Sequence, residues 1–100
     1  MPRVELTDQV AKDFKRIADH LLQHDVANAA LRVQEIMDAI GVLEHNPRIG
    51  RPTGTDLREL VIGRDSHGYM ALYRHVAEAD IVLVLAIRAQ REAGYFRDTE

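Results

Sequence analysis

The feature that most constrains the fold of this chain is an uninterrupted apolar run from Ile81 to Ile87. Such a run, rich in valine, isoleucine and leucine, is typical of a central strand that is buried on both faces of a sheet. Arg88 and Arg91 follow it, and Tyr95 is close behind. We therefore expect an arginine and tyrosine surface where the strand leaves the core, suited to an acidic partner or a phosphate group.

Hydrophobic periodicity predicts the remaining elements. Residues 3–6 alternate as a short strand, and apolar residues three and four positions apart predict two helices. The first helix ends near His24, and the second runs from Val26 to the pair Asn46-Pro47, with Thr7 and Asp25 as candidate caps. Residues 47–56 hold two prolines and two glycines and predict a loop. Residues 57–62 and 69–76 predict two more strands.

The predicted order of elements is β-α-α-β-β-β. A short turn between the helices predicts an antiparallel helical hairpin, and short links between the last three strands predict an antiparallel meander. We therefore expect a single α+β domain over residues 1–100, in which the hairpin packs on one face of a small antiparallel sheet.

Composition excludes several classes of protein. The chain has no cysteine, which rules out disulfides and thiolate chemistry. His20 and His24 have a helical spacing that can bind metal, but no third ligand is near in sequence, so we expect neither a metal nor a cofactor. A net charge of −3 argues against autonomous sequence-specific DNA binding. No signal peptide or membrane-spanning run is evident, so we expect a cytoplasmic protein with no membrane partner.

Basic residues are distributed unevenly along the chain. Residues 46–97 hold eight arginines, no lysine and six acidic residues. Arginine is the residue best suited to bidentate recognition of carboxylate and phosphate groups. This half of the chain is therefore the candidate for contact with an acidic partner.

Four segments resemble toxins of the ParE/RelE superfamily of type II toxin–antitoxin systems, and the ParE branch more closely. The segment Leu43–Arg51 is similar to the family's Leu-x-x-x-Pro-x-x-Gly-Arg loop. The other three are the alanine-rich start of the second helix at residues 27–30, the strand residues 57–60 followed by Tyr69 and Tyr73-Arg74, and the C-terminal signature at residues 84–95. One departure is Ala89, where we expect histidine in close relatives.

The resemblance implies a toxin that inhibits DNA gyrase, blocks replication and serves in plasmid stabilisation. It would act by binding rather than by catalysis. The expected target-binding residues lie at the arginine and tyrosine surface and its extension: Arg88, Arg91, Tyr95, Phe96, Arg97, Arg58 and Arg64.

The resemblance also implies a cognate antitoxin, whose disordered segment folds onto the toxin. We expect it to bind exposed apolar residues of the helical hairpin, namely Leu22, Val26 and Ala30. A toxin dimer within a hetero-oligomeric complex is compatible with this arrangement.

Two alternatives remain open at this point. The first is a ribosome-dependent mRNA endonuclease of the RelE type, in which Arg58 and Arg88 would stabilise phosphate charge and Tyr95 would donate a proton. The second is a degenerate, non-toxic binding module, which Ala89 makes credible. A degenerate module would arrest neither replication nor translation.

Overall fold

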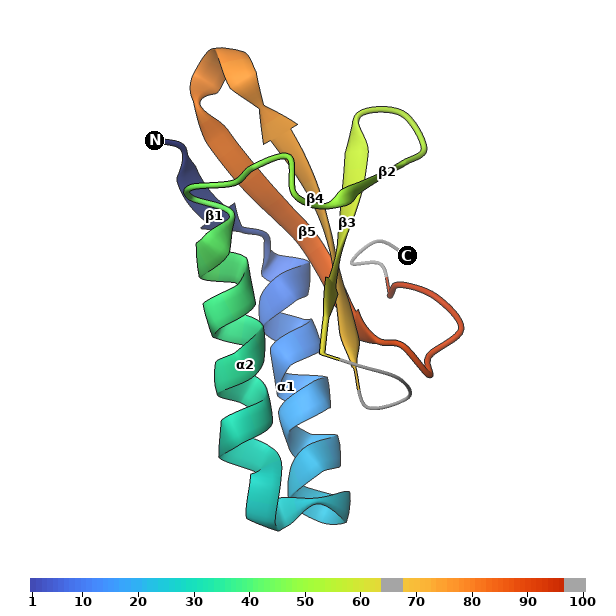
Figure 1. Cartoon of the computed structure of the whole chain (residues 1–100). Coiled ribbons are helices and arrows are strands. Elements are labelled where there is room, and N and C mark those ends of the chain that lie inside the picture. Colours follow the sequence, from blue (N-terminus) through green and yellow to red (C-terminus); the bar gives the residue numbers. More distant parts are fainter. Residues whose placement is uncertain (64–67, 97–100) are drawn as a thin grey trace.

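The computed structural model describes residues 1–63 and 68–96, which form two helices on one face of a five-stranded sheet (Figure 1). The expected α+β fold is confirmed. The helices and strands are β1 Arg3–Leu6, α1 Asp8–His24, the 3₁₀ turn η1 Val26–Asn28, α2 Ala29–Val42, β2 Arg51–Thr53, β3 Leu57–Ile62, β4 Tyr69–Val76, the 3₁₀ turn η3 Ala77–Ala79 and β5 Ile81–Ala89. The strand order is β1-β5-β4-β3-β2.

The sheet is mixed, so the prediction of a wholly antiparallel sheet is wrong. Strands β3, β4 and β5 do form the expected antiparallel meander. Strand β1, however, pairs parallel with β5, and Val4 lies opposite Val82. The helical hairpin makes this possible, because it carries the chain away from β1 and leaves that edge free for the last strand.

Strand β2 lies inside the segment that was expected to be a loop. It pairs antiparallel with β3, and Pro52 lies opposite Arg58. Proline lacks an N–H and is tolerated on an edge strand, which is where β2 lies. The turn to β3 then uses positive φ angles at Gly54 and Asp56.

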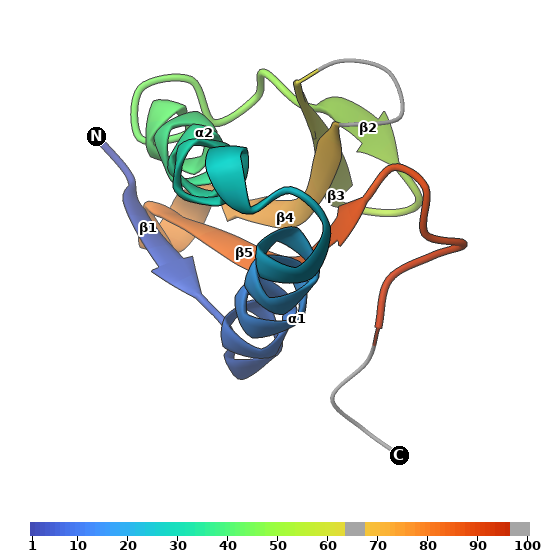
Figure 2. The same ribbon diagram turned by 90° about the horizontal axis from the view of Figure 1, so that it is seen from below.

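Burial along β5 alternates, so the expectation of a strand buried on both faces is wrong. Val82 and Val84 are fully buried against the helices, whereas Leu83 is partly exposed. Figure 2 shows the reason, since both helices cover the same side of the sheet. The apolar core therefore lies between a layer of helices and the sheet, and Ile36, Leu43 and Tyr73 are among its largest fully buried side chains.

The predicted helix caps occupy the right positions but make other bonds. Thr7 precedes α1, yet its hydroxyl donates to the carbonyl oxygen of Leu85 at 2.9 Å instead of capping the helix. Asp25 precedes η1 and accepts a hydrogen bond from the Asn28 amide at 3.0 Å. Thr7 therefore ties the start of α1 to the middle of β5.

Side chains of α1 complete the pairing of β5 where β1 ends. Strand β1 reaches only to Leu6, opposite Val84, and the rest of that edge would be unpaired. The Asp13 carboxylate is fully buried and accepts a hydrogen bond from the Ile87 N–H at 2.8 Å. Arg16 donates to the Ile87 carbonyl oxygen at 3.3 Å. The end of β5 is thereby fixed to α1, and the segment that follows starts from a rigid point.

Candidate functional site

The segment after β5 folds back over the sheet face that the helices leave open. The Tyr95 hydroxyl donates to the Glu59 carboxylate of β3 at 2.8 Å. The Arg88 guanidinium lies 5.2 Å from the centre of the Tyr95 ring, within cation–π range. Met70, next to Arg88 on the paired strand, is buried there. We name these four residues, Glu59, Met70, Arg88 and Tyr95, the C-terminal cluster.

Arg88 is engaged inside the protein. One of its amino groups donates to the Glu92 carbonyl oxygen at 2.9 Å, with longer contacts to those of Ala89 and Gln90 at 3.2 and 3.4 Å. The other contacts the Met70 sulfur at 3.2 Å. Arg88 therefore holds the C-terminal segment in place, a role that the sequence does not indicate.

A second set of bonds fixes the same segment to α1. The Glu92 carboxylate accepts two hydrogen bonds from Arg16, both at 3.0 Å, and one from the Ala89 N–H at 2.8 Å. Burial disfavours the charge on Glu92, but the hydrogen bonds from Arg16 and Ala89 outweigh it, so the pKa of Glu92 lies below its ordinary value. Arg16 also lies 4.2 Å from the centre of the Phe96 ring.

The Tyr95 phenol is held in its protonated form. Burial raises its pKa above the ordinary value, and the hydrogen bond to the negatively charged Glu59 raises it further. A phenol with a raised pKa is a weaker acid, so this environment opposes the proton donation that RNA cleavage would ask of Tyr95.

The expected target-binding residues do not form one patch. Arg88 and Tyr95 come together in the C-terminal cluster, whereas Arg58 of β3 points to the loop before β2 and donates to the carbonyl oxygens of Arg48 and Gly50 at 3.2 and 2.8 Å. Arg91 lies elsewhere, in a pocket between the helices and the sheet. Arg64 and Arg97 are outside the described residues.

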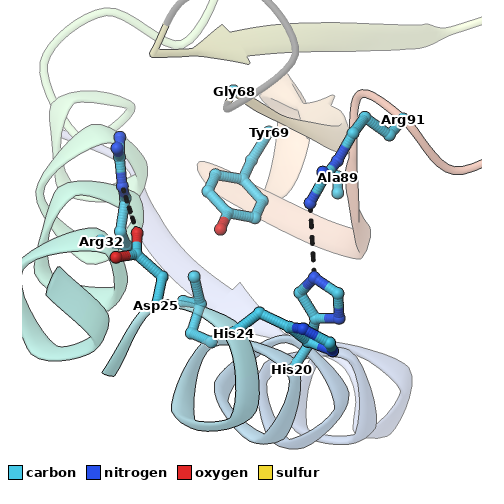
Figure 3. A pocket seen from close by; sticks show the side chains of 9 residues that line it. His20, His24, Asp25, Arg32, Gly68, Tyr69, Ala89 and Arg91 are labelled. Atoms are coloured by element: carbon cyan, nitrogen blue, oxygen red, sulfur yellow. Dashed lines mark hydrogen bonds and ion pairs between the residues drawn. The ribbon is translucent and has the colours of Figure 1, made fainter. Parts of the chain in front are cut away.

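That pocket opens between the helical turn and the end of the sheet, and has a volume of about 540 Å³ (Figure 3). The exposed Arg91 contacts the Nε2 atom of His20 at 3.3 Å. The rings of His20 and His24 lie 4.4 Å apart, and Ala89 forms part of the wall. We name it the histidine pocket, after the side chains that define it: His20, His24, Arg32, Tyr69, Ala89 and Arg91.

The three hairpin residues expected to bind an antitoxin are all exposed. Leu22 and Val26 are 58% and 69% accessible, and Ala30 is exposed beside them. Leu31 and Met37 of α2 add further exposed apolar surface that the helical pattern does not predict. The binding role of these residues stays a prediction.

The residues that sequence reasoning missed are the polar ones that position the C-terminal segment, above all Asp13. A signal for it exists, because Asp13 lies three residues after Val10 and four before Ile17 on the apolar stripe of α1. A charged residue on a buried stripe indicates a paired interior carboxylate.

The part of the chain that the structure describes holds neither a candidate metal site nor a membrane-spanning helix. No three histidine, cysteine or acidic side chains there are placed so that they could hold a metal ion. Within the same residues, neither helix has the length and apolar character needed to cross a bilayer.

Comparison with known proteins identifies the family. Residues 4–94 match the family described as the ParE toxin of the type II toxin–antitoxin system parDE. No curated protein matches the chain significantly.

Solved structures agree with this match. The chromosomal ParDE system from P. aeruginosa contains a chain that superposes with a TM-score of 0.75 and 25% identity, over 89% of this chain and 96% of that one. A chain of the E. coli RelBE toxin–antitoxin complex superposes with a TM-score of 0.64 and 14% identity, over 92% of this chain and 100% of that one. The isolated E. coli RelE toxin superposes with a TM-score of 0.63 and 15% identity, over 93% of this chain and 89% of that one. The family match over nearly the whole chain is decisive: the protein belongs to the ParE toxins of type II toxin–antitoxin systems.

Proposed function

We propose that this ParE-family chain arrests growth by binding DNA gyrase and blocking replication, and that a cognate antitoxin neutralises it. Binding is favoured over catalysis because the three residues expected to carry RNA cleavage, Arg58, Arg88 and Tyr95, all make hydrogen bonds within the protein. Arg58 and Arg88 donate to backbone carbonyl oxygens, and Tyr95 donates to Glu59.

A ribonuclease of this fold needs cations that are free to meet the developing phosphate charge and an acid ready to release a proton. A guanidinium already bound to carbonyl oxygens must break those bonds before it can bind phosphate. A phenol whose pKa is raised gives up its proton less readily. The same bonds make the C-terminal segment a rigid surface, and rigidity favours recognition because little ordering entropy is lost on binding.

The surface offered to a target carries exposed cationic and aromatic groups. Arg91 is exposed near the start of the C-terminal segment, and Phe96 at its described end is half exposed. Aromatic residues and arginine dominate the energetics of protein interfaces. Since gyrase acts on chromosomal DNA, the proposal places the toxin in the cytoplasm.

The exposed apolar surface of the hairpin supports an antitoxin partner. Leu22 and Val26 lie at its turn, and the solved RelBE and ParDE structures are themselves toxin–antitoxin systems. Val26→Asp should sharply weaken copurification with the product of a neighbouring antitoxin gene, because it places a charge in an apolar interface. Ile49→Asp is the matched control, since Ile49 is 55% exposed at the other end of the hairpin. Equal effects of both changes would remove the hairpin turn from the antitoxin site.

Induced expression tests the target in cells. Gyrase poisoning should give filamentous cells and a DNA-damage response, and Arg91→Ala should relieve both without affecting the fold, because Arg91 is exposed. Arg88→Ala is not a clean test, since it also frees the C-terminal segment. Rapid loss of translation without filamentation would favour the RelE-type nuclease. If the cells show neither response, and Ala89→His restores toxicity, the protein is a degenerate module.

A further inference from the structure

Apart from Arg91, the residues of the histidine pocket have no part in the gyrase proposal, yet the pocket gathers hydrogen-bond donors from three sides. His20 and His24 come from α1, and Arg32 comes from α2 (Figure 3). Tyr69 begins β4, and Arg91 lies two residues after the end of β5. A smaller hollow of about 230 Å³ continues it along α1 and shares four of its residues. The combined space is of the size that takes small-molecule ligands.

The Tyr69 hydroxyl is a hydrogen-bonding group in the pocket without a protein partner among the described residues. Tyr69 is only 8% exposed, and its hydroxyl points into the open space between Arg32 and His20 (Figure 3). Within residues 1–63 and 68–96 the hydroxyl makes no hydrogen bond. This oxygen is not closed off from solvent, so it is available to hydrogen-bond to a ligand that enters the pocket. Burial raises the pKa of Tyr69 despite the nearby arginines, so the phenol remains a donor.

The two arginines retain donors for a ligand. Arg32 faces Asp25 at 3.9 Å and Glu35 at 3.8 Å, distances too long for hydrogen bonds. Arg91 contacts only His20, and no acidic side chain pairs with it among the described residues. A guanidinium can only donate, so Nε2 of His20 is the acceptor in this contact.

Charge in the pocket favours an anion. Among the lining residues that the structure describes, Asp25 is the one acidic residue, and Arg32 faces it. Glu92 borders the smaller hollow, where Arg16 binds it. Within residues 1–63 and 68–96 no acidic side chain compensates the positive charge of Arg91, which lies at the mouth of a partly apolar space lined by Leu21 and Ala89. An anion bound there would be held by charge-assisted hydrogen bonds.

We propose that the histidine pocket binds a phosphate monoester. A planar carboxylate has two oxygens and cannot face donors on three walls at once, whereas a tetrahedral phosphate offers oxygens in all these directions. Arg91 and Tyr69 contact the phosphate from the sheet side, and Arg32 and the histidines contact it from the helices. The remaining volume takes the esterified group against the apolar wall.

The test is a titration of the isolated chain with each probe, monitored by the NMR signals of the backbone and of the histidine rings. The probes are inorganic phosphate, adenosine monophosphate, and a dinucleotide whose only phosphate is a diester. We expect saturable 1:1 binding of the monoester, stronger than that of inorganic phosphate, with the largest shifts at His20, His24 and Tyr69.

Three variants make the assignment specific. Arg91→Gln should weaken binding by about tenfold or more, since it removes a charge-assisted contact. Tyr69→Phe should weaken it about three- to tenfold without loss of thermal stability, because the hydroxyl has no partner to lose. Arg74→Gln is the matched control, since Arg74 is an exposed arginine of β4 that does not line the pocket.

Several results would overturn the proposal. No saturable binding at millimolar phosphate would remove the site, and equal weakening by Arg74→Gln would show non-specific attraction to surface arginines. A diester that binds better than the monoester would assign the pocket to a nucleic-acid backbone instead. Binding is measured without gyrase, so this result and that of the gyrase proposal are independent of each other.

Discussion

Replacing Asp13 by alanine tests the idea that α1 holds the end of β5 in place. The carboxylate is fully buried and accepts from three donors: the Ile87 N–H at 2.8 Å, the Gln9 amide at 2.9 Å and the Arg16 guanidinium at 2.6 Å. Alanine leaves all three donors without this acceptor and places a cavity between helix and strand.

The magnitude follows from these contacts. An unpaired buried N–H costs about 1–3 kcal/mol, and removing one partner of a buried ion pair costs about 3–5 kcal/mol. These costs overlap, because Arg16 keeps Glu92 as a second partner. We expect Asp13→Ala to lower the free energy of unfolding by about 3–4 kcal/mol, and the melting temperature by roughly 12–30 °C for a domain of this size.

Chemical and thermal denaturation followed by circular dichroism measure the loss. Asp13→Asn keeps an oxygen acceptor for the Ile87 N–H and should cost less, about 1–2 kcal/mol. Asp19→Ala is the control, because Asp19 lies on the same helix in an exposed pair with Lys15 and should cost under about 0.5 kcal/mol. If Asp13→Ala cost no more than Asp19→Ala, the role given to this carboxylate would be refuted.

Three further predictions concern the same framework. Gly50→Ala should destabilise the fold by about 1–3 kcal/mol, because a Cβ there would lie 2.7 Å from the Tyr73 ring and 2.8 Å from the Glu59 carbonyl oxygen. Gly41→Ala should instead stabilise it by about 0.5–1 kcal/mol in the same denaturation assay, since a Cβ in that exposed helical position meets nothing within 4 Å. The folded-state pKa of Glu92 lies below the ordinary value of 4.5. The charged Glu92 side chain therefore contributes to the free energy of unfolding above about pH 5, and this contribution is lost as the pH falls through the folded-state pKa. The stability difference between wild type and Glu92→Gln should therefore shrink on acidification, and a difference that stays constant down to low pH would contradict the assigned pairing.

The local elements of the fold follow from the sequence because their signals are local. The helical periodicity that ends near His24 and the strand-forming composition of residues 57–62 depend only on near neighbours, and the structure has α1 and β3 at these positions. Leu43–Arg51 matches a family loop, and the structure explains its glycine: the Gly50 N–H donates to the buried Tyr73 hydroxyl at 2.8 Å, where no side chain fits.

The features that sequence reasoning missed depend on contacts between distant segments. Nothing in residues 3–6 indicates pairing with β5, nearly 80 positions away, so the parallel edge could not be predicted. The run Ile81–Ile87 is apolar throughout, so its sequence does not indicate which face of the strand the helices cover. Arg88 was expected to face a target, but its partners are carbonyl oxygens of a turn whose path the sequence does not specify.

A supercoiling assay with purified protein, DNA gyrase, relaxed plasmid and ATP tests directly whether gyrase is the target. If it is, we expect dose-dependent loss of supercoiling with accumulation of linear DNA, and a loss of this effect in Arg91→Ala. Unaffected supercoiling and no linear product from a folded protein, with Ala89→His equally inactive, would contradict gyrase as the target.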